Sequence, residues 1–462
     1  MIYNVLDYGA IPDGKTLNSS AVQNAINAAS EAGGGTVLFP EGEFVLSTVF
    51  LRSNIRIEIS KDCKILGSLS FYDYAPEEKL DYPTYQDASH SYFNCSMFVG
   101  RDCNNITITG GGTIDMRSVW DEDNVRNIVH RGPKCIALVG CNNVEISSLG
   151  IYYATDLAVY FTDCENVDVF RLKMKVYIDG VSPDNSKHCR IHDCEIEAGD
   201  DGIVFKSSYN LNRIDICKDI HVYNCKVRSR CNAVKFGTET NGGFEDILIE
   251  NIEITDTRIT GISVESVDGA IIDGVTIRNV TMQNVNAPIF VHIGNRMRGP
   301  EGRSIGRIRN LTLENIVATG PYHEYEIIET YYATYVLDDK IQYPWVYSGK
   351  KNPDYEKLKG NRFVDWQMTS NVCGLVGIPL ENITLRNVHL SLDGGVESFN
   401  PDVPEGATTY PEVFVYGKIL PAKGIFFRHI EGLTLDNVTV TTERPDIRED
   451  FVFVDVNNLV QQ

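Results

Sequence analysis

The chain has 462 residues, of which 43% are hydrophobic and 23% charged, and its formal net charge is −21. A surface this acidic argues against nucleic acid and anionic membranes as partners, because both need a basic surface. It leaves acidic sugars open as ligands, since a local basic cleft can lie on an acidic protein, and no run approaches the ~20 apolar residues of a membrane span.

The N-terminal segment has neither the basic region nor the apolar core of a secretory signal. Many of the twelve cysteines recur within one repeated phrase, where small apolar thiols would stack in a core. We therefore expect free thiols and a cytoplasmic location. A mature secreted form without its leader would begin in the same way.

A helix is predicted for residues 19–32, followed by Gly33-Gly34-Gly35, which ends it. Its apolar face consists of Ala21, Val22, Ala25, Ile26 and Ala29. Such a helix would cap a stack of repeats, whose terminal unit otherwise exposes core and free strand edges.

One short sequence pattern, called the strand phrase below, recurs along the chain. It begins with a polar pair, continues with an apolar residue, any residue and a second apolar residue, and usually ends with Asn, Asp or Cys followed by another apolar residue. Each copy has the period-two alternation of a short strand. The copies are residues 103–108, 141–146, 164–169, 189–194, 218–225, 245–252, 274–280, 309–316, 381–388 and 432–438. Steps of 23 (Val144 to Val167), 27 (Ile220 to Ile247) and 28 (Ile247 to Val275) indicate a solenoid.

The strand phrases select the kind of solenoid. Helical repeats are excluded because almost no window in residues 100–320 shows a period of 3.6, and the leucine-rich-repeat spacing is absent. A parallel β-helix remains, with coils ~4.8 Å apart, as one all-β domain over residues 1–462. Asn and Asp in the phrase fit turn corners with left-handed backbone.

Two segments interrupt the repeat, and one further sequence motif coincides with it. Residues 320–378 and 395–424 lack the strand phrase and are predicted to be loop insertions on one face, near the active-site groove. The repeat also accounts for five Asn-x-Thr sequences that match glycosylation acceptors. They begin at Asn105, Asn279, Asn310, Asn382 and Asn437.

The densest polar cluster contains Asp179, Asp200 and Asp201. Asp179 and Asp200 are 21 residues apart, close to one coil, so the three carboxylates should lie on one face of neighbouring coils. Like charges this close raise at least one pKa, as a general acid requires. Glycoside hydrolysis uses such a set: an acid for the leaving oxygen, and a base or nucleophile.

Other interpretations of these acids remain open. We interpret Asp184 as a structural turn residue. Asp200 and Asp201 lie in an otherwise apolar phrase. Burying a carboxylate there costs free energy, so a purely structural role does not explain these two residues. A calcium site is the other functional interpretation, because clustered carboxylates bind hard cations.

The stretches Asp-Gly-Val-Ser-Pro-Asp (179–184) and Gly-Asp-Asp-Gly-Ile-Val-Phe-Lys-Ser (199–207) resemble the polygalacturonase signature of glycoside hydrolase family 28. Residues 7–14 and 33–37 resemble the opening segment of that family. The resemblance implies a right-handed parallel β-helix and an inverting hydrolase that needs no metal or cofactor. It implies Asp200 as proton donor, with Asp179 and Asp201 holding and deprotonating water.

Three positions depart from the family pattern. Tyr177 stands where the first motif usually has Asn. Asn232 stands where a histidine would orient the acid or the substrate; Asn keeps hydrogen bonding but carries no charge. Ser263-Val264-Glu265 aligns with the motif that would bind the galacturonate carboxylate and has lost both cations, which indicates a changed substrate-binding site at Asn232 and Glu265.

Other cations are candidates for binding a uronate. These are Lys206, Lys235, Arg296 and Arg428; arginine in particular binds carboxylates bidentately. For Lys235 and the two arginines, a solvated surface charge is the alternative. Lys206 should point inward beside the paired acids, where an unpaired lysine is costly.

Three functions remain as hypotheses. The first is an inverting, exo-acting glycoside hydrolase on galacturonate-containing or related oligosaccharides. The second is a polysaccharide lyase on the same fold, with an Arg or Lys base and Ca²⁺. The third is a non-catalytic carbohydrate-binding solenoid. The expected partner is an oligosaccharide, and the oligomeric state stays open.

Overall fold

The computed structural model describes residues 1–85, 88–120, 131–320, 325–326, 335–337, 347–351, 362–363 and 368–462. They fall into two compact units. Unit 1 holds the described residues of Met1–Gly199, Asn210–Asn212 and Ile327–Asn361; unit 2 holds those of Asp200–Tyr209, Arg213–Glu326 and Arg362–Gln462.

Unit 1 consists mainly of short strands, many of them three to six residues long. The strands are short because the chain turns a corner of the coil after each one. Its helices are η1 (Val5–Tyr8), α1 (Ser19–Glu31), η2 (Phe71–Asp73) and η3 (Ala88–Ser91). Its strands are β1 (Ile2–Asn4), β2 (Asp13–Leu17), β3 (Gly35–Phe39), β4 (Gly42–Leu46), β5 (Val49–Phe50), β6 (Ile55–Ile59), β7 (Cys63–Gly67), β8 (Ser96–Arg101), β9 (Asn104–Thr109), β10 (Thr113–Asp115), β11 (Lys134–Val139), β12 (Asn142–Ser147), β13 (Gly150–Tyr152), β14 (Val159–Thr162), β15 (Glu165–Phe170), β16 (Lys173–Val176), β17 (Val181–Asp184), β18 (Lys187–His192), β19 (Glu195–Ala198), β27 (Tyr335–Leu337) and β28 (Tyr347–Lys351).

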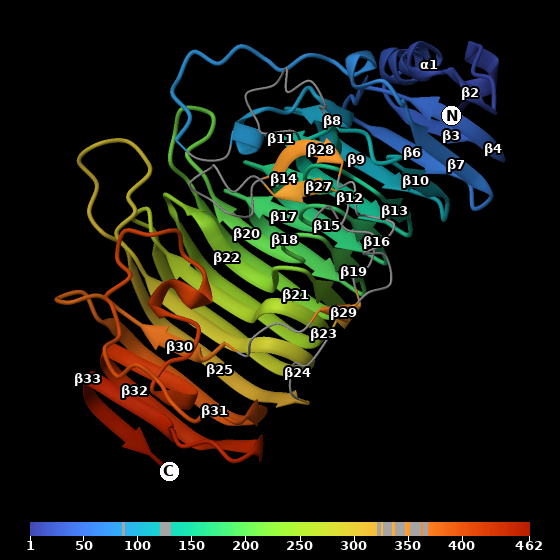
Figure 1. The fold of residues 1–462 in the computed structure, drawn as a ribbon. Helices are drawn as coiled ribbons and strands as arrows, with labels where there is room; N and C mark the ends of the chain where they lie inside the picture. The colour runs from blue at the N-terminus through green and yellow to red at the C-terminus, as the bar shows by residue number, and fades with distance from the viewer. Residues whose placement is uncertain are drawn as a thin grey trace. The chain divides into compact units, whose positions relative to one another are not determined.

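Most of these strands form three parallel ladders, one for each side of a coil, whereas β27 and β28 pair with each other in antiparallel fashion. The first runs β3–β6–β9–β12–β15–β18. The second runs β4–β7–β10–β13–β16–β19 and the third β5–β8–β11–β14–β17. Val144 pairs with Val167, so the predicted step of 23 residues is one coil, and Figure 1 shows the strands stacked in chain order.

Helix α1 lies at the N-terminal end of unit 1 (Figure 1). Val22, Ala25, Ile26 and Ala29 are fully buried, which confirms most of the predicted apolar face; Ala21 is partly exposed. The predicted capping helix is therefore present, one residue shorter than expected.

Unit 2 has longer strands because single strands continue around the corners of the coil. Its helix is η4 (Val413–Tyr416). Its strands are β20 (Ile203–Ser207), β21 (Ile216–Ser229), β22 (Asn232–Thr240), β23 (Gly243–Ser266), β24 (Ile271–Ile293), β25 (Arg307–Thr319), β26 (Tyr325–Glu326), β29 (Arg362–Phe363), β30 (Ser370–Cys373), β31 (Leu380–Gly394), β32 (Ala422–Arg444) and β33 (Glu449–Gln461).

Two parallel ladders organise unit 2. One runs β20–β22–β23–β24–β30–β32–β33 and the other β21–β23–β24–β25–β31–β32–β33. Leu311 pairs with Ile383 and Ile383 with Leu433. The two predicted insertions therefore lengthen a coil without shifting the ladder.

The Asn corners of the repeat adopt left-handed backbone, as the sequence predicts. Asn279, for example, has φ 55°; its Nδ2 donates to Asn251 Oδ1 at 3.1 Å, and its Oδ1 accepts from Asn315 Nδ2 at 3.0 Å. All five Asn-x-Thr asparagines have positive φ and donate to a neighbouring coil, so the repeat explains their presence.

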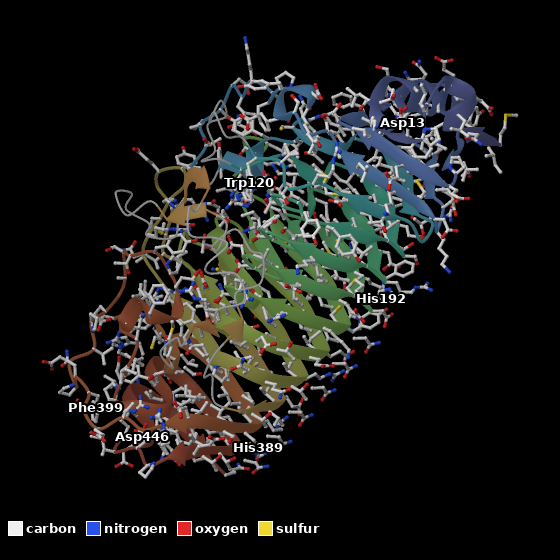
Figure 2. The ribbon with its side chains drawn as sticks, turned by 45° about the vertical axis from the view of Figure 1, so that its right-hand side comes forward. Asp13, Trp120, His192, His389, Phe399 and Asp446 are labelled. Carbon is white, nitrogen blue, oxygen red and sulfur yellow. The ribbon has the colours of Figure 1, made fainter. Side chains whose placement is uncertain are left out.

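The buried residues of the coils are mostly apolar. All twelve cysteines are buried and free, as predicted. Figure 2 labels His389, a half-buried residue of β31 whose Nδ1 lies 2.8 Å from Thr439 Oγ1 on the next strand. In the described part of the chain, no helix has the length and apolar character to cross a membrane.

The two predicted insertions differ in what is described. Most of residues 320–378 lie outside the described residues. The second segment, residues 395–424, is described throughout and contains η4. Asn371 of β30 donates from Nδ2 to Val413 O at 3.0 Å, which places this segment against the ladder that begins at β20.

Candidate active site

Asp179 follows β16, and Asp200 follows β19 on the next coil of the same ladder. Val176 O accepts a hydrogen bond from Gly199 N at 2.9 Å. A Cβ at residue 199 would lie 2.2 Å from Tyr177 O, so only glycine permits this approach of the two coils. Asp200 directly follows this glycine in the chain and is the first residue of unit 2.

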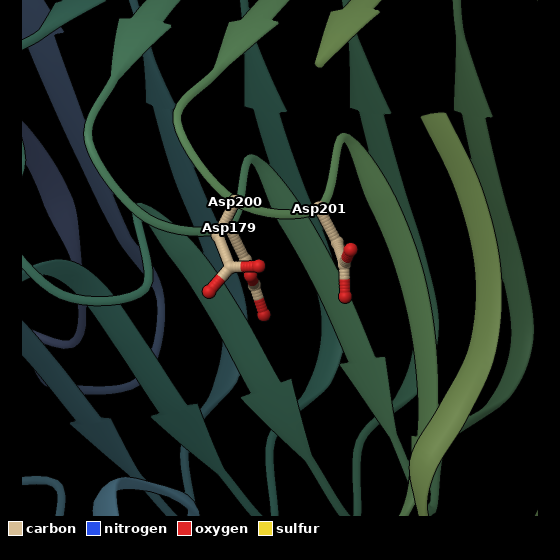
Figure 3. A group of neighbouring side chains, drawn as sticks. All are labelled: Asp179, Asp200 and Asp201. Atoms are coloured by element: carbon tan, nitrogen blue, oxygen red, sulfur yellow. The ribbon is translucent and has the colours of Figure 1, made fainter. Parts of the chain in front are cut away.

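The three predicted acids are divided between the two units: Asp179 belongs to unit 1, and the consecutive residues Asp200 and Asp201 begin unit 2. Figure 3 labels their three side chains. Asp179 and Asp201 are buried and Asp200 is half-buried. The proximity of Asp179 to the other two acids stays a prediction from the one-coil spacing; clustered carboxylates of this kind have the oxygen chemistry to hold Ca²⁺.

Asn232 orients Asp201 within unit 2. Asp201 Oδ1 accepts from the backbone N of Asn232 at 3.1 Å and from its Nδ2 at 2.9 Å. Asn232 is fully buried, and its Oδ1 has no hydrogen-bond partner among the described residues. The carboxylate of Asp201 is thus fixed by Asn232, one of the three positions at which the sequence departs from the family pattern.

Lys235 is buried among carboxylates. Its Nζ lies 2.8 Å from Glu412 Oε1, 3.6 Å from Glu265 Oε1 and 3.7 Å from Asp201 Oδ2. Burial opposes the charge on Lys235, but the three carboxylates outweigh it and hold the pKa of the ammonium well above its usual range. Lys235 is therefore a charged, internally held residue and not a solvated one.

Glu265 is the most buried acid of this group. Its Oε1 accepts from Ser263 Oγ at 2.6 Å, whereas its Oε2 has no hydrogen-bond partner among the described residues. Burial raises the pKa of Glu265 to about 8, against the lowering effect of Lys235. A Cβ at Gly237 would lie 3.1 Å from Oε2, so a glycine leaves space beside this oxygen.

Glu412 joins this group from residues 395–424. Its Oε2 lies 3.4 Å from Asn232 Nδ2, in addition to the contact with Lys235. Burial raises the pKa of Glu412, and Lys235 lowers it. Sequence reasoning placed this segment near the active site but missed Glu412, since it belongs to no repeat and no motif.

The other three predicted cations are also held by partners. Lys206 Nζ lies 3.2 Å from Glu239 Oε2, and the Arg296 guanidinium pairs with Asp268. Arg428 donates to the backbone oxygens of residues 403 and 404 at 3.0 and 2.7 Å. All three side chains are buried, so the surface-charge interpretation of the two arginines is wrong, and Lys206 points inward as predicted.

His292 lies beside these residues and was not predicted. It pairs in register with Glu265, and its Nδ1 lies 2.6 Å from Tyr416 Oη. Burial, followed by the charges of Arg428 and Arg296, lowers the pKa of His292 to about 3. This histidine is therefore neutral at ordinary pH.

Two residues near the first acid have structural partners within unit 1. Tyr177, at the first departure, packs edge-on against Trp120 at 5.6 Å between ring centroids, and Trp120 is labelled in Figure 2. Asp184 is fully buried in β17, where its Oδ2 accepts from Tyr160 Oη at 2.8 Å. The structural interpretation of Asp184 thus holds, although the residue lies in a strand and not in a turn.

Comparison with known protein families identifies one match. The family model described as glycosyl hydrolases family 28 matches residues 35–327. A probable polygalacturonase of Vitis vinifera is 27% identical over 267 residues, 54% of this chain and 54% of the relative. An exo-poly-alpha-D-galacturonosidase of Dickeya chrysanthemi is 25% identical over 301 residues, 54% of this chain and 50% of the relative. The chain thus spans about half the length of these curated relatives.

Solved structures share the fold. An exopolygalacturonase of Thermotoga maritima superposes with a TM-score of 0.67 at 17% identity, covering 96% of this chain and 92% of the other. A family 28 exopolygalacturonase of Yersinia enterocolitica has a TM-score of 0.69 at 20% identity, covering 99% and 78%. At these identities the likeness concerns the fold, and it confirms the predicted right-handed parallel β-helix.

Proposed function

Because the chain belongs to glycosyl hydrolases family 28, we propose that it hydrolyses glycosidic bonds in galacturonate-containing or related oligosaccharides. The observation that carries the proposal is the pair of consecutive carboxylates Asp200 and Asp201 in unit 2, of which Asp201 is fixed by two hydrogen bonds from Asn232. A glycosidase needs at least two such groups, one to protonate the leaving oxygen and one to activate water or attack the sugar.

The proposed roles follow the family resemblance. Asp200, the half-buried member, protonates the leaving oxygen. Asp179 and Asp201 hold a water molecule and remove its proton as it attacks the anomeric carbon. Asn232 supports the role of Asp201, because its two hydrogen bonds fix the direction in which the remaining oxygen faces.

The proposed stereochemical outcome is inversion. Inverting glycosidases separate their carboxyl groups by ~6.5–9.5 Å and retaining ones by ~5–5.5 Å. Inversion is the outcome that the family resemblance implies. A retained anomer would instead assign one of the aspartates as a nucleophile.

We further propose exo action. Residues 395–424 lie over the ladder that starts at β20 and bring Glu412 within 3.4 Å of Asn232. A segment in this position restricts the length of chain that can pass Asp201. Two of the similar proteins described above are exopolygalacturonases by name, in keeping with such a restriction.

The test is a screen of pectic oligosaccharides and aryl glycosides, with the anomer of the first product read by NMR. The proposal expects one sugar released per event from a chain end, in the inverted configuration. Release of internal fragments would contradict exo action. Failure to cleave any substrate of the screen, by a folded protein, would contradict the hydrolase proposal itself.

A further inference from the structure

Three of the four cations predicted to bind a substrate carboxylate are already committed to partners within unit 2. Lys206 pairs with Glu239 and Arg296 with Asp268, while Arg428 donates to two backbone oxygens. Each side chain is no more than 6% exposed. A uronate carboxylate would have to displace these internal contacts before it could pair with any of the three.

The fourth cation, Lys235, is outnumbered by carboxylates. Asp201, Glu265 and Glu412 all lie within 3.7 Å of its Nζ. Glu265 is neutral below a pKa of about 8, because burial disfavours its charge. Three carboxyl groups therefore surround one ammonium group, and the group formed by Asp201, Lys235, Glu265 and Glu412 contains more acids than cations.

We infer that the sugar bound beside Asp201 and Glu412 is neutral and carries a hydroxymethyl or methyl group where a uronate carries its carboxylate. This inference rests on the proposed hydrolase function and specifies its substrate. A uronate at this position would bring a like charge against Asp201 and Glu412, at a cost in affinity. Sugar hydroxyls instead donate hydrogen bonds to carboxylate oxygens, which accept several each.

Glu412 is the residue that sets this selectivity. It is the member of the group supplied from outside the ladder, by residues 395–424, and 8% of its side chain is exposed, compared with none of Glu265. Replacing Glu412 by glutamine would remove one of the three carboxyl groups beside Lys235 and so reduce the excess of acids over cations. The Glu412→Gln variant therefore should accept a uronate better than the wild-type protein does.

The experiment compares substrates that differ only in the carboxylate. Oligogalacturonides of one defined length serve as the acidic substrate. The neutral counterparts are the same oligomers with one sugar at a time carboxyl-reduced to galactose, so that each position is tested. Initial rates give kcat/KM for the wild-type protein, for Glu412→Gln, and for the control Glu381→Gln, a half-buried carboxylate of β31 that pairs with Arg307 at 2.9 Å.

For the wild-type protein, reduction at one particular position should raise kcat/KM by about tenfold or more. Glu412→Gln should reduce the difference in kcat/KM between the acidic and the reduced oligomer, chiefly by lowering KM for the acidic one. Glu381→Gln should leave this difference unchanged. Preference for the fully acidic oligomer, or a difference that Glu412→Gln does not alter, would overturn the inference while leaving the hydrolase function intact.

Binding separates this inference from the proposed function. Asp200→Asn protein, with and without Glu412→Gln, is titrated calorimetrically with the same acidic and singly reduced oligomers. Tighter binding of one reduced oligomer, lost with Glu412→Gln, supports the inference even if the wild-type protein cleaves nothing and the hydrolase proposal fails. Equal binding of both kinds of oligomer, or binding of neither, overturns it.

Discussion

At the scale of single residues, the acids of the site differ sharply in their surroundings. Asp200 is half-buried, Asp201 is fixed by two hydrogen bonds from Asn232, and Glu265 is fully buried with an unpartnered oxygen. Isosteric amide substitutions remove charge with little change of volume. They can therefore separate an acid that takes part in the reaction from one that shapes the site.

Asp200→Asn should lower kcat by roughly 10²–10⁴-fold, because an amide cannot donate the proton that the leaving oxygen needs. Initial rates on the best substrate of the screen measure the loss, and circular dichroism checks the fold. The control is Asp193→Asn, which changes an acid on the outer face of unit 1 whose side chain is 46% exposed. Cleavage by Asp200→Asn near the wild-type rate would show that the acid assignment is wrong.

Glu265 should make stability depend on pH. Its pKa is about 8 in the folded protein, raised by burial, against a usual value of 4.5. The folded state therefore keeps a proton that the unfolded chain loses above pH 4.5. The free energy of unfolding should fall as pH rises from about 4.5 to 8, by up to about 1.4 kcal/mol per pH unit from this group.

Urea unfolding of wild-type protein and Glu265→Gln at pH 5 and pH 8 measures this effect. The wild-type protein should lose more stability between the two pH values than the variant, whose amide does not titrate. Equal losses in both proteins would mean that Glu265 is already ionised at pH 5.

At the scale of elements, the Asn corners link successive coils through side-chain amides on left-handed backbone. For residues other than Gly, Asn and Asp, this conformation costs roughly 1–2 kcal/mol. A corner Asn therefore contributes both a tolerated backbone geometry and hydrogen bonds, and the two contributions are separable by substitution.

Asn279→Ala should destabilise unit 2 by about 1–3 kcal/mol, since alanine adds backbone strain to the loss of two hydrogen bonds. Asn279→Gly loses the same hydrogen bonds without the strain, so it should cost less than Asn279→Ala. Chemical denaturation of the three proteins gives the order. A glycine variant less stable than the alanine variant would contradict the role assigned to the left-handed corner.

The sequence predicted those elements whose residues repeat. The ten strand phrases lie in β9, β12, β15, β18, β21, β23, β24, β25, β31 and β32, because each coil places its apolar residues at the same register as its neighbours. Asp179 and Asp200 were found by the same spacing. Inward-pointing Lys206 was predicted, but burial of Lys235, Arg296 and Arg428 was not, because their partners lie on other coils or in residues 395–424.

Glu412 marks the limit of that reasoning. It contacts Lys235 across 177 residues of sequence, and nothing in residues 395–424 repeats. Periodicity locates residues on a ladder, whereas the path of a loop depends on the packing of its own side chains, such as Tyr416 against His292. The sequence therefore predicts that residues 395–424 lie near the site, but it does not predict that Glu412 is the residue that contacts Lys235.

At the scale of the whole molecule, the twelve thiols are buried and free. We expect them to react slowly with a thiol reagent in the native protein, and all twelve to react after unfolding in denaturant without reductant. Fewer than twelve reactive thiols in denaturant would reveal a disulfide. The cytoplasmic location expected from these thiols stays a prediction, which cell fractionation tests.

The hydrolase and the lyase hypotheses differ in their need for a metal ion. Hydrolysis by three carboxylates should continue in the presence of excess chelator, and its products should lack the ultraviolet absorbance of an unsaturated sugar. Loss of activity with EDTA, restored by Ca²⁺, together with absorbing products, would instead favour elimination. The two measurements on one reaction mixture decide between them.

The register of unit 2 has an evolutionary consequence. Leu311, Ile383 and Leu433 stay in line, although 72 and then 50 residues separate them along the chain. Selection can therefore lengthen, replace or exchange the segment that delivers Glu412 without rebuilding the stack beneath it. Substrate preference and fold can diverge independently in such an architecture, so grafting residues 395–424 onto a related scaffold offers a direct way to transfer specificity.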